Sequence, residues 1–250
     1  MNRFKPTVQD YTNYTTEDFR VWRTLFSRQK RLLGSKASSV YLECTRKAGF
    51  SSSNIPSFIQ TSRLLSRQTG WALKVAPELV PQEEFFRSLA ERVFPATCWL
   101  RSLDELDYLE EPDMFHDVFG HVPLLMDHSF ALFVEGFAKL VLKWLDVPEA
   151  VRMLGNFYWF TVEFGLIQEG NAMKAYGAGI LSSRSETLHC LSSKASLRSF
   201  DVVEMLCTSY RTDVLQERYF VIDSFEQLYL SLVEVENSLR RVLEHAAVEV

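Results

Sequence analysis

Two histidines lie five residues apart in a short stretch of the sequence that is rich in apolar residues. His116 and His121 belong to residues 113–123, DMFHDVFGHVP. On a regular α-helix, a five-residue step turns the second side chain about 140° away from the first. We expect the chain to leave the helix at Gly120, because glycine often takes the left-handed conformation that ends helices and Pro123 disfavours a helical residue before it. His121 could then fold back beside His116 and share a metal ion with it, although one packed and one exposed histidine would explain the spacing more simply.

A carboxylate with few local partners follows further along the chain. Glu163 lies in the strongly apolar stretch 155–167, GNFYWFTVEFGLI. In a helix, Phe160 and Ile167 would share its face, so we expect the carboxylate to be buried. A buried carboxylate must be paired, neutralised or bound to a metal ion, and residues 157–167 contain no Lys, Arg or His. The alternatives are a salt bridge to a distant arginine and a glutamate that faces solvent.

Together, His116, His121 and Glu163 could form a triad of two histidines and one carboxylate. Such a triad binds Fe(II) on one face and leaves three coordination positions open. A zinc peptidase fits the sequence less well, because its H-E-x-x-H signature needs a four-residue step and a glutamate after the first histidine. In this chain Asp117 follows His116, and the step is longer by one residue.

Two other kinds of protein stay open at this point. Di-iron carboxylate oxidases and iron-binding proteins use Glu-x-x-His pairs, and the chain has one such pair at 186–189 and a looser Asp-x-x-His at 113–116. The sequence has no two clean repeats of this pair, which disfavours this alternative. The second alternative is a helical module that binds a partner protein and holds its metal ion in a closed structural site.

The pattern of apolar residues predicts a mainly α protein with a minor component of short β-strands, built as one domain. Capping patterns and apolar periodicity predict helices that begin after Thr15, at Pro81, at Ser102 and at Pro112, and further helices over 129–144, 148–169 and 224–247. Strand-like segments are few and short, and the candidates are 71–75 and 97–100. The apolar stripe of the amphipathic 224–247 helix could form a coiled-coil dimer, but such a stripe more often packs on its own domain.

Composition and charge exclude several classes of function. The formal net charge is -5, from 27 basic and 32 acidic side chains that are scattered along the chain, which argues against general nucleic-acid binding. No apolar run is long enough for a membrane span or typical of a signal peptide. The four cysteines, which include no C-x-x-C pair, are Cys44, Cys98, Cys190 and Cys207. We therefore expect a soluble, cytoplasmic protein with reduced thiols.

Three stretches, in this order, resemble the pterin-dependent aromatic amino acid hydroxylases, in particular the short bacterial phenylalanine 4-hydroxylase type. Residues 111–124, EPDMFHDVFGHVPL, resemble the iron-binding stretch of the family, and residues 158–166, YWFTVEFGL, resemble the segment that carries its third iron ligand. Residues 174–183, KAYGAGILSS, are similar to a third block, and the likeness extends upstream through 69–71 and 21–26. The resemblance implies a single catalytic domain over 1–250, without a regulatory domain or a tetramerisation tail. A monomer is then the default, with a dimer through the last helix as the alternative.

The resemblance also implies roles for particular residues. The two histidines and Glu163 would bind the iron and form the catalytic centre. Four residues would form the substrate site, namely Arg101, Pro112, Trp159 and Ser182. A guanidinium presents a planar fork that matches a carboxylate, so Arg101 would hold the carboxylate of the substrate, while Pro112 and Trp159 would enclose its ring. Ser182 would hydrogen-bond a ligand histidine and fix its tautomer.

Five residues match positions near the pterin in the family, namely Phe85, Leu79, Val80, Asp117 and Tyr158. Phe85 would stack on the pterin ring, although without the resemblance it would be interpreted as a core residue. The backbone of Leu79 and Val80 would recognise the edge of the pterin. Glu78 stands where many relatives have glycine, and this glutamate would strain the loop if the position needs a positive φ angle.

These features predict an iron(II)- and tetrahydropterin-dependent monooxygenase that hydroxylates the ring of an aromatic amino acid. Its partners would be the amino acid, O2 and the reduced pterin, with no nucleic acid and no membrane. L-Phenylalanine, converted into L-tyrosine, is the expected substrate, because Trp159 resembles the phenylalanine and tyrosine enzymes more than the tryptophan enzymes. The same chemistry on tyrosine or tryptophan is the alternative.

Overall fold

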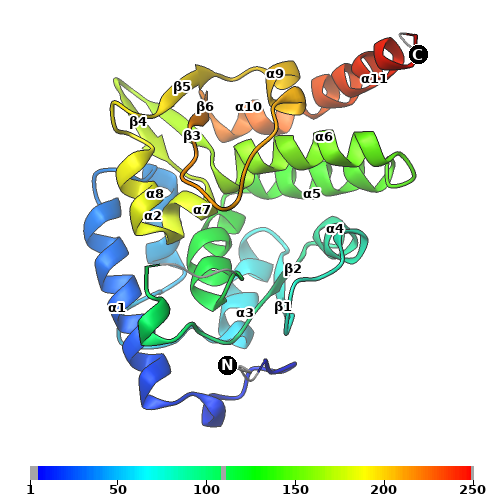
Figure 1. The fold of residues 1–250 in the computed structure, drawn as a ribbon. Helices are drawn as coiled ribbons and strands as arrows, with labels where there is room; N and C mark the ends of the chain where they lie inside the picture. Colours follow the sequence, from blue (N-terminus) through cyan, green and yellow to red (C-terminus); the bar gives the residue numbers. More distant parts are fainter. Residues whose placement is uncertain (1–4, 108–110, 249–250) are drawn as a thin grey trace.

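The structure is a computed structural model that describes residues 5–107 and 111–248. It is mostly helical, and its short strands form one sheet of two strands and one sheet of four (Figure 1). This architecture confirms the prediction of a mainly α protein with a minor β component. The described chain begins with a 3-10 turn, Tyr11–Asn13, and three helices, α1 (Thr16–Leu33), α2 (Ser39–Lys47) and α3 (Phe58–Gln68).

The first long helix, α1, begins where the sequence predicts. The Thr15 hydroxyl accepts a hydrogen bond from the backbone N–H of Asp18, and the Asp18 carboxylate accepts one from the backbone N–H of Thr15. The two residues therefore form a capping box. On the following turns Val21, Trp22 and Leu25 are fully buried, which fixes the rotation of the helix against the core.

A small parallel sheet follows the N-terminal helices. Its two strands are β1 (Ala72–Val75) and β2 (Val93–Ala96), and α4 (Gln82–Ala90) connects them. The prediction of a strand near 71–75 and of a helix after Pro81 is thus confirmed.

The strand expected over 97–100 is wrong, because β2 ends just before it. In this stretch the backbone bonds to side chains of another segment instead of to a strand. The N–H of Thr97 donates to the Asp117 carboxylate at 2.7 Å, and the N–H of Arg101 donates to the Asp113 carboxylate at 3.0 Å. These bonds hold the stretch against the segment that carries the two histidines.

The centre of the chain holds both segments that are predicted to carry metal ligands. A 3-10 turn (Leu103–Glu105) precedes a π-helix, η3 (Phe115–His121), and a 3-10 helix, η4 (Val122–Met126). The long helices α5 (His128–Leu142) and α6 (Pro148–Tyr158) follow, and a second π-helix, η5 (Trp159–Glu163), continues α6. Phe137 of α5 stacks on Phe157 of α6 with ring centroids 5.8 Å apart, which joins the two helices.

The helix predicted over 148–169 is too long, because Leu166–Glu169 forms strand β3 instead. At Gly165, a Cβ atom would lie 2.1 Å from the Tyr176 ring and 2.4 Å from the Thr161 carbonyl oxygen, so the turn out of the helix needs a glycine. The strand then pairs with β4 and β6. Such pairing depends on neighbours that are not adjacent in sequence, and local periodicity does not report it.

The C-terminal part combines a small sheet with short helices. Its strands are β3, β4 (Ala172–Ala175), β5 (Ser196–Ser199) and β6 (Arg218–Ile222), in the spatial order β4-β3-β6-β5. β3 and β4 form an antiparallel hairpin that turns at Gly170 (φ 58°), and β6 lies parallel to both of its neighbours. The intervening helices are α7 (Ala178–Ser182), α8 (Arg184–His189) and α9 (Val202–Cys207).

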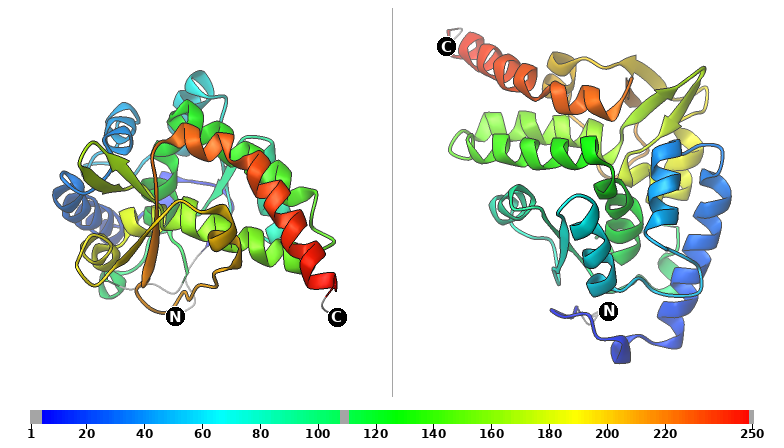
Figure 2. Two further views of the ribbon diagram at one scale, coloured as in Figure 1. Left: turned by 90° about the horizontal axis from the view of Figure 1, so that it is seen from above. Right: turned by 180° about the vertical axis from the view of Figure 1, so that it is seen from behind.

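The helix expected over 224–247 is divided in two. Ser224 caps α10 (Phe225–Leu230), as predicted, and α11 (Leu232–Val248) begins after a break of one residue. Two residues of the apolar stripe on α11 are fully buried, Val235 and Leu239. This part of the stripe therefore packs on the rest of the chain. Figure 2 shows that α11 extends outward, with its C-terminal end farthest from the other helices.

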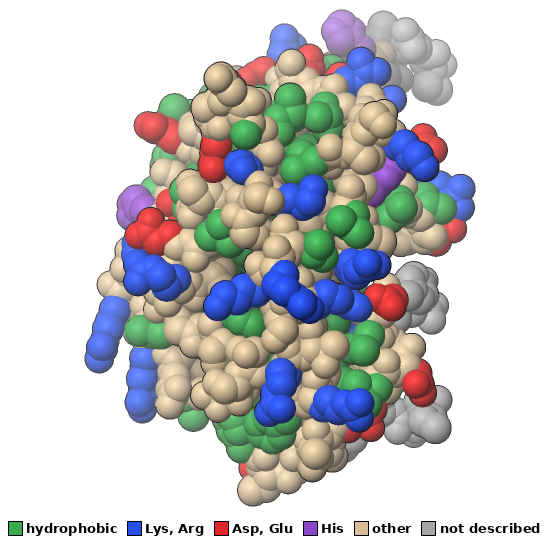
Figure 3. All heavy atoms as spheres, turned by 90° about the vertical axis from the view of Figure 1, so that its left-hand side faces the viewer, with side chains coloured by type: hydrophobic (Ala, Val, Ile, Leu, Met, Phe, Trp, Pro, Cys, Tyr) green, Lys and Arg blue, Asp and Glu red, His purple; other side chains and the backbone are tan. Residues whose placement is uncertain are grey.

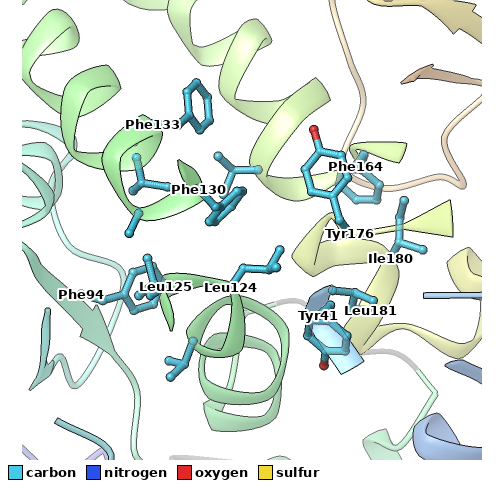
Figure 4. Close-up of a cluster of buried hydrophobic side chains, with 14 of the residues drawn as sticks. Tyr41, Phe94, Leu124, Leu125, Phe130, Phe133, Phe164, Tyr176, Ile180 and Leu181 are labelled. Atoms are coloured by element: carbon cyan, nitrogen blue, oxygen red, sulfur yellow. The ribbon is translucent and has the colours of Figure 1, made fainter. Parts of the chain in front are cut away.

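A large part of the core lies where the central helices meet the C-terminal part. Figure 4 shows Leu124 and Leu125 of η4 close to Phe130 and Phe133 of α5, with Tyr176 beside them. All five side chains are almost completely buried. The rings of Phe130 and Tyr176 meet edge to face, with centroids 6.3 Å apart, so the core ties the helix after the two histidines to the segment before α7.

Basic side chains are distributed less evenly on the surface than along the sequence. Figure 3 shows a band of Lys and Arg side chains on the face that lies on the left in Figure 1, where α1 runs. The exposed basic residues of α1 are Arg20, Arg23, Lys30 and Arg31. Within residues 5–107 and 111–248, no helix has the length and apolar character needed to cross a membrane.

Candidate active site

The three side chains predicted to bind a metal ion come together. His121 Nε2 lies 3.2 Å from Oε1 of Glu163, His116 Nε2 lies 3.6 Å from Oε2 of Glu163, and the two Nε2 atoms are 3.2 Å apart. The three donor groups lie within 4.8 Å of one another, and they are the only such group among the described residues. Two imidazole nitrogens and one carboxylate oxygen in this arrangement can hold one metal ion.

A π-helix, and not a left-handed glycine, brings the two histidines together. In a π-helix, hydrogen bonds join residues i and i+5, so His116 and His121 return to nearly the same side of η3. The expectation that the chain leaves the helix at Gly120 is wrong, since Gly120 has no positive φ angle and the chain continues directly into η4. A helix with 3.6 residues per turn does not produce this pairing, so the spacing of the two histidines alone does not predict it.

The second π-helix, η5, ends at Glu163 and presents its carboxylate to the two histidines. The side chain is 14 % exposed, and its ion-pair partners in the described chain are the two imidazoles, with no Lys or Arg. This contradicts the alternative of a salt bridge between Glu163 and a distant arginine. Burial raises the pKa of the carboxyl, but His121 and then His116 outweigh burial and hold the pKa below its usual value.

Burial also determines the charge of the first histidine. It lowers the pKa of His116 to about 4, so the imidazole is neutral near pH 7, which is the state that binds a metal ion. For His121, burial lowers the pKa, but the charge of Glu163 and a hydrogen bond to it outweigh burial and raise the pKa. Without a metal ion, His121 and Glu163 therefore stabilise each other's charged forms.

Ser182, the last residue of α7, holds His116 from the side opposite the donor atoms. Its Oγ lies 2.9 Å from His116 Nδ1 and donates its hydrogen to the carbonyl oxygen of Ala178 at 2.8 Å. A hydroxyl has one hydrogen to donate, so the Ser182 oxygen accepts from the Nδ1–H of His116. This leaves His116 Nε2 unprotonated and directed at Glu163, and that tautomer is the one that binds a metal ion.

Arg101 forms a buried ion pair with Asp113. The Nε and Nη2 groups of Arg101 donate to the Asp113 carboxylate at 2.9 and 2.8 Å, and the same carboxylate accepts from the backbone N–H groups of Arg101 and His116. Asp113 is fully buried and Arg101 is 8 % exposed. The two side-chain bonds to Asp113 use Nε and Nη2 and do not involve the third guanidinium nitrogen, Nη1. One edge of the guanidinium is therefore available for a second carboxylate.

Two cavities reach the candidate metal centre, the first at all three donor residues and the second at His116 and Glu163. The first has a volume of about 310 Å³ and is lined by all five residues predicted near the pterin, namely Phe85, Leu79, Val80, Asp117 and Tyr158. Both histidines and Glu163 also line it. The structure therefore gathers these residues, which are far apart in the sequence, around one space beside the candidate metal centre.

The second cavity has a volume of about 650 Å³ and is lined by all four residues predicted for the substrate site, namely Arg101, Pro112, Trp159 and Ser182. It shares Leu79, Pro112, His116 and Glu163 with the first cavity. The two cavities therefore meet at the candidate metal centre, which is open to both of them.

The loop before α4 shows no backbone strain at Glu78. Among the described residues, Arg92 (φ 60°) is the only one other than glycine with a positive φ angle. Glu78 thus occupies its position without a left-handed backbone, and the strain considered from the sequence is absent. The residue lines the first cavity, so it can still influence what this cavity binds.

Asp117 connects the first cavity to Thr97, the residue that follows strand β2. Its carboxylate accepts the hydrogen bond from the Thr97 N–H, and the side chain lines the cavity next to the histidines. Burial raises the pKa of Asp117 to about 7. The residue is therefore a second carboxyl group at this cavity in addition to Glu163.

Trp159 is contacted by a loop whose residues were not predicted from the sequence. Residues 208–217 connect α9 to β6 and line the second cavity through residues 212–216. Tyr210 stacks on the Trp159 indole with ring centroids 4.1 Å apart, and the Trp159 Nε1–H donates to Gln216 Oε1 at 2.9 Å. No local pattern marks these residues, because they lie in a loop and in the part of the chain where the resemblance to the hydroxylases is loosest.

The pair at 186–189 does not provide a second iron site. Glu186 accepts hydrogen bonds from the Tyr219 hydroxyl and from the backbone N–H of Gln216. His189 Nε2 is hydrogen-bonded to the Gln216 carbonyl oxygen. Both side chains are thus engaged with protein groups, and no second cluster of three ligands occurs in the described part of the chain, which argues against the di-iron alternative.

Two histidines and one glutamate with open space on more than one side are typical of mononuclear non-haem iron sites. In this chain, two π-helices present these three side chains. The family model of the biopterin-dependent aromatic amino acid hydroxylases matches residues 5–246. The chain therefore belongs to this family, and the resemblance found in the three sequence stretches is confirmed.

Known members of the family are similar over most of the chain. Phenylalanine-4-hydroxylase of Ralstonia nicotianae is 46 % identical over 222 residues, which are 88 % of this chain and 71 % of that protein. A structure of Chromobacterium violaceum phenylalanine hydroxylase with bound oxidized Fe(III) has a TM-score of 0.90 and 42 % identity, and the match covers 94 % of this chain and 86 % of that chain. A second structure of that protein, with iron(III) and the oxidized cofactor 7,8-dihydrobiopterin bound, has a TM-score of 0.89 and 42 % identity over 95 % of this chain and 86 % of that chain.

Proposed function

We propose that this chain is an iron(II)- and tetrahydropterin-dependent monooxygenase that converts L-phenylalanine into L-tyrosine. The observation that carries the proposal is the meeting of two cavities at two imidazoles and one carboxylate that pair with no Lys or Arg among the described residues. The similar proteins from Ralstonia and Chromobacterium are phenylalanine hydroxylases, which supports phenylalanine over the other aromatic amino acids.

The donor set fits Fe(II). His116 is neutral near pH 7 and Glu163 is charged, and a ferrous ion would displace the proton that Glu163 favours on His121, so that two imidazoles and one carboxylate bind the ion on one face. No fourth His, Cys, Asp or Glu joins the group in the described chain. Structural metal sites are usually closed by four protein ligands, so this group favours an open catalytic site over a metal site in a partner-binding module.

The first cavity fits a flat bicyclic cofactor. Phe85 and Val80 offer apolar contact for a ring system, whereas Asp117 and the backbone near Leu79 offer polar groups for its edge. Small-molecule sites commonly combine apolar walls with a few polar groups that fix orientation. The cavity is therefore suited to a reduced pterin that lies beside the metal centre.

The second cavity fits an aromatic amino acid. The free edge of Arg101 binds its carboxylate, and Pro112 and Trp159 enclose its ring next to His116 and Glu163. This places the ring beside the metal centre, a positioning effect that removes much of the entropic barrier, and the apolar walls keep water away. When bound, Fe(II) and the reduced pterin would supply the electrons that activate O2, and O2 would supply the oxygen atom that is transferred to the ring.

The test uses the purified chain, reconstituted with Fe(II) without oxygen and then mixed with O2, a tetrahydropterin and L-phenylalanine. We expect tyrosine as the product, detected by mass spectrometry, and much less product from tyrosine or tryptophan. In the matched variant Glu163→Gln, which keeps the shape of the side chain but removes its charge, bound iron and product should both be lost while the circular dichroism spectrum is retained. If no aromatic amino acid is hydroxylated by the unmodified chain, the proposal is wrong.

We further propose that the protein acts in the cytoplasm, as a monomer that takes O2 from solution. Its four cysteines are free, as is usual in a reducing compartment, and burial of Val235 and Leu239 uses part of the apolar stripe on α11. Light scattering coupled to gel filtration tests the second statement. A stable dimer at micromolar concentration would contradict it.

A further inference from the structure

Gln216 is a buried polar residue that the proposed chemistry does not use directly. It lies near the end of the loop 208–217 and is 6 % exposed. Its Nε2 group donates to the carbonyl oxygens of Arg211 (2.7 Å) and Val214 (3.2 Å), and its Oε1 accepts from the Trp159 indole at 2.9 Å. Both ends of the amide are thus occupied, and its orientation is fixed because the indole N–H can only donate.

The backbone of Gln216 is held as firmly as its side chain. Its N–H donates to the Glu186 carboxylate at 3.0 Å, and its carbonyl oxygen is hydrogen-bonded to His189 Nε2 at 3.0 Å. Glu186 also accepts a hydrogen bond from the hydroxyl of Tyr219 on β6. Gln216 is therefore joined to α8, to β6 through Glu186, and to its own loop. A buried network with satisfied partners is rigid, so it can act as a support.

The group that this support holds is the indole of Trp159, which lines the second cavity. Tyr210 stacks on the indole with centroids 4.1 Å apart and an angle of 8° between the planes, and the ring of Phe164 lies 4.5 Å away. Stacking restrains the tilt of an aromatic ring but does not prevent it from sliding or turning within its own plane. A directional hydrogen bond at Nε1 does prevent this, and Gln216 provides that bond.

We infer that Gln216 is a positioning residue that sets the size of the ring-binding part of the second cavity, and this inference rests on the proposed function. The Oε1 atom of Gln216 fixes the Trp159 indole through a hydrogen bond. Its Nε2 atom binds the carbonyl oxygens of residues 211 and 214 and so holds this segment of the loop together. Residues 212–216 line the same cavity. The Gln216 side chain therefore positions both the Trp159 indole and the loop residues that enclose the space for the ring. The preference for phenylalanine over the larger tryptophan thus depends on Gln216.

The experiment compares the Fe(II) form of the unmodified chain with two variants at this position. Gln216→Met has a similar length but makes neither set of hydrogen bonds, whereas Gln216→Glu keeps the acceptor for Trp159 and loses the donor to the two carbonyls. Gln60→Met, on the exposed side of α3, is the matched control. Binding of L-phenylalanine and of L-tryptophan is measured by calorimetry without oxygen. KM, kcat and the ratio of tyrosine formed to pterin oxidised are then measured with oxygen.

Gln216→Met should weaken phenylalanine binding roughly tenfold, because the loosened Trp159 indole must then be ordered when the amino acid binds. Tryptophan binding should change less, so the preference between the two amino acids falls. Less tyrosine should form for each pterin oxidised, because the ring is no longer held in one position. Gln216→Glu should also weaken phenylalanine binding, because its buried carboxylate would face the carbonyl oxygens of Arg211 and Val214 without a donor. Since part of the effect of Gln216 passes through the indole, Gln216→Met should lower the preference less in the Trp159→Phe variant than in the unmodified chain.

Unchanged binding of both amino acids by Gln216→Met, with an unchanged ratio of tyrosine to oxidised pterin, would overturn the inference. If Gln216→Met does not fold, Gln216→Glu and Trp159→Phe carry the comparison, and an unaltered preference in both would overturn it equally. The binding data also separate this inference from the proposed function. An unmodified chain that binds phenylalanine but produces no tyrosine refutes the proposed function alone, and one that binds no aromatic amino acid refutes both.

Discussion

Arg101 supports the fold in addition to its proposed role at the substrate site. Arg101→Ala would leave the fully buried carboxylate of Asp113 without its guanidinium partner. Breaking such a pair costs roughly 3–5 kcal/mol, so we expect a large loss in the free energy of unfolding together with weaker binding of phenylalanine. Urea unfolding at pH 7 and calorimetry measure the two effects.

A double variant separates these two effects of Arg101. Asp113→Asn combined with Arg101→Met removes both charges. The amide oxygen introduced at position 113 can still accept from one of the two backbone N–H groups, of residues 101 and 116, that bond to different oxygens of the carboxylate in the unmodified chain. Part of the stability should return without any return of phenylalanine binding. Equal recovery of both properties would mean that Arg101 does not contact the substrate.

Tyr176 carries a buried hydroxyl with no hydrogen-bond partner among the described residues. Tyr176→Phe removes a group that was desolvated without compensation, so the free energy of unfolding should stay the same or rise by about 1 kcal/mol. Tyr41→Phe is the matched control, because the Tyr41 hydroxyl donates to the Phe119 carbonyl oxygen at 2.8 Å. This control should lose roughly 1–2 kcal/mol. Equal losses in urea unfolding would show that Tyr176 has a partner after all.

At the scale of elements, the π-helix η3 depends on close packing against α7. A Cβ atom at Gly120 would lie 3.0 Å from the carbonyl oxygen and 3.1 Å from the Cβ of Ala178. Gly120→Ala should therefore push the two elements apart, at a cost of about 1–3 kcal/mol. Because Ser182 on α7 holds His116, iron affinity should fall as well. Urea unfolding and the iron content after dialysis measure these changes.

The control for Gly120 is a glycine with open space around it. At Gly155 in α6, a Cβ atom would meet nothing within 4 Å. Gly155→Ala should leave the iron content unchanged and stabilise the chain by about 0.5–1 kcal/mol, because alanine loses less backbone freedom in a helix. A loss of iron in both variants would mean that the contact with Ala178 is not the cause.

The elements that could be predicted are those with local signals. The capping pairs at Thr15 and Ser224 mark true helix starts, since caps act between neighbours in sequence. The π-helical form of η3 could not be predicted, because it depends on packing with α7, and neither could β3, which pairs with strands that come later in the chain. The prediction that His121 lies beside His116 was right, although the mechanism assigned to Gly120 was wrong.

At the scale of the whole molecule, Glu135 links α5 to the loop before β2. Its carboxylate accepts hydrogen bonds from Lys139 at 2.6 Å and from Arg92 at 2.8 Å. Burial raises the pKa of Glu135, but these bonds outweigh burial and lower the pKa. A carboxyl with a lowered pKa in the folded state adds stability above its unfolded-state pKa, and this stability is lost as the pH falls through the folded-state pKa.

Glu135→Gln should therefore destabilise the chain by about 1 kcal/mol at pH 7, and the difference should shrink as the pH drops below about 5 toward 3. Urea unfolding at a series of pH values measures this dependence. Glu149→Gln, which removes a carboxylate paired with one exposed arginine, is the control and should have a smaller effect at every pH. A constant difference for Glu135→Gln across this range would contradict the assigned ion pairs.

Most of the candidate site could be named from the sequence, because the resemblance covers its long motifs. The residues that line the two cavities come from distant segments, and the structure brings those named for the pterin to one cavity and those named for the substrate to the other, while their roles remain proposals. Gln216 and Tyr210 could not be named in this way. Their contacts with Trp159 exist only after α8, α9 and β6 have assembled, and no periodicity or capping rule describes a loop of that kind.

The shared border of the two cavities, at Leu79, Pro112, His116 and Glu163, has a consequence for inhibitor design. An arylalanine tethered to a pterin-like bicycle would place its second half at a high effective concentration once the first half is bound. Such tethering raises affinity by roughly 10²–10⁴-fold when the tether spans the gap, and by almost nothing when it is too short. The affinities of a series of such compounds with tethers of increasing length would therefore measure the distance between the two cavities.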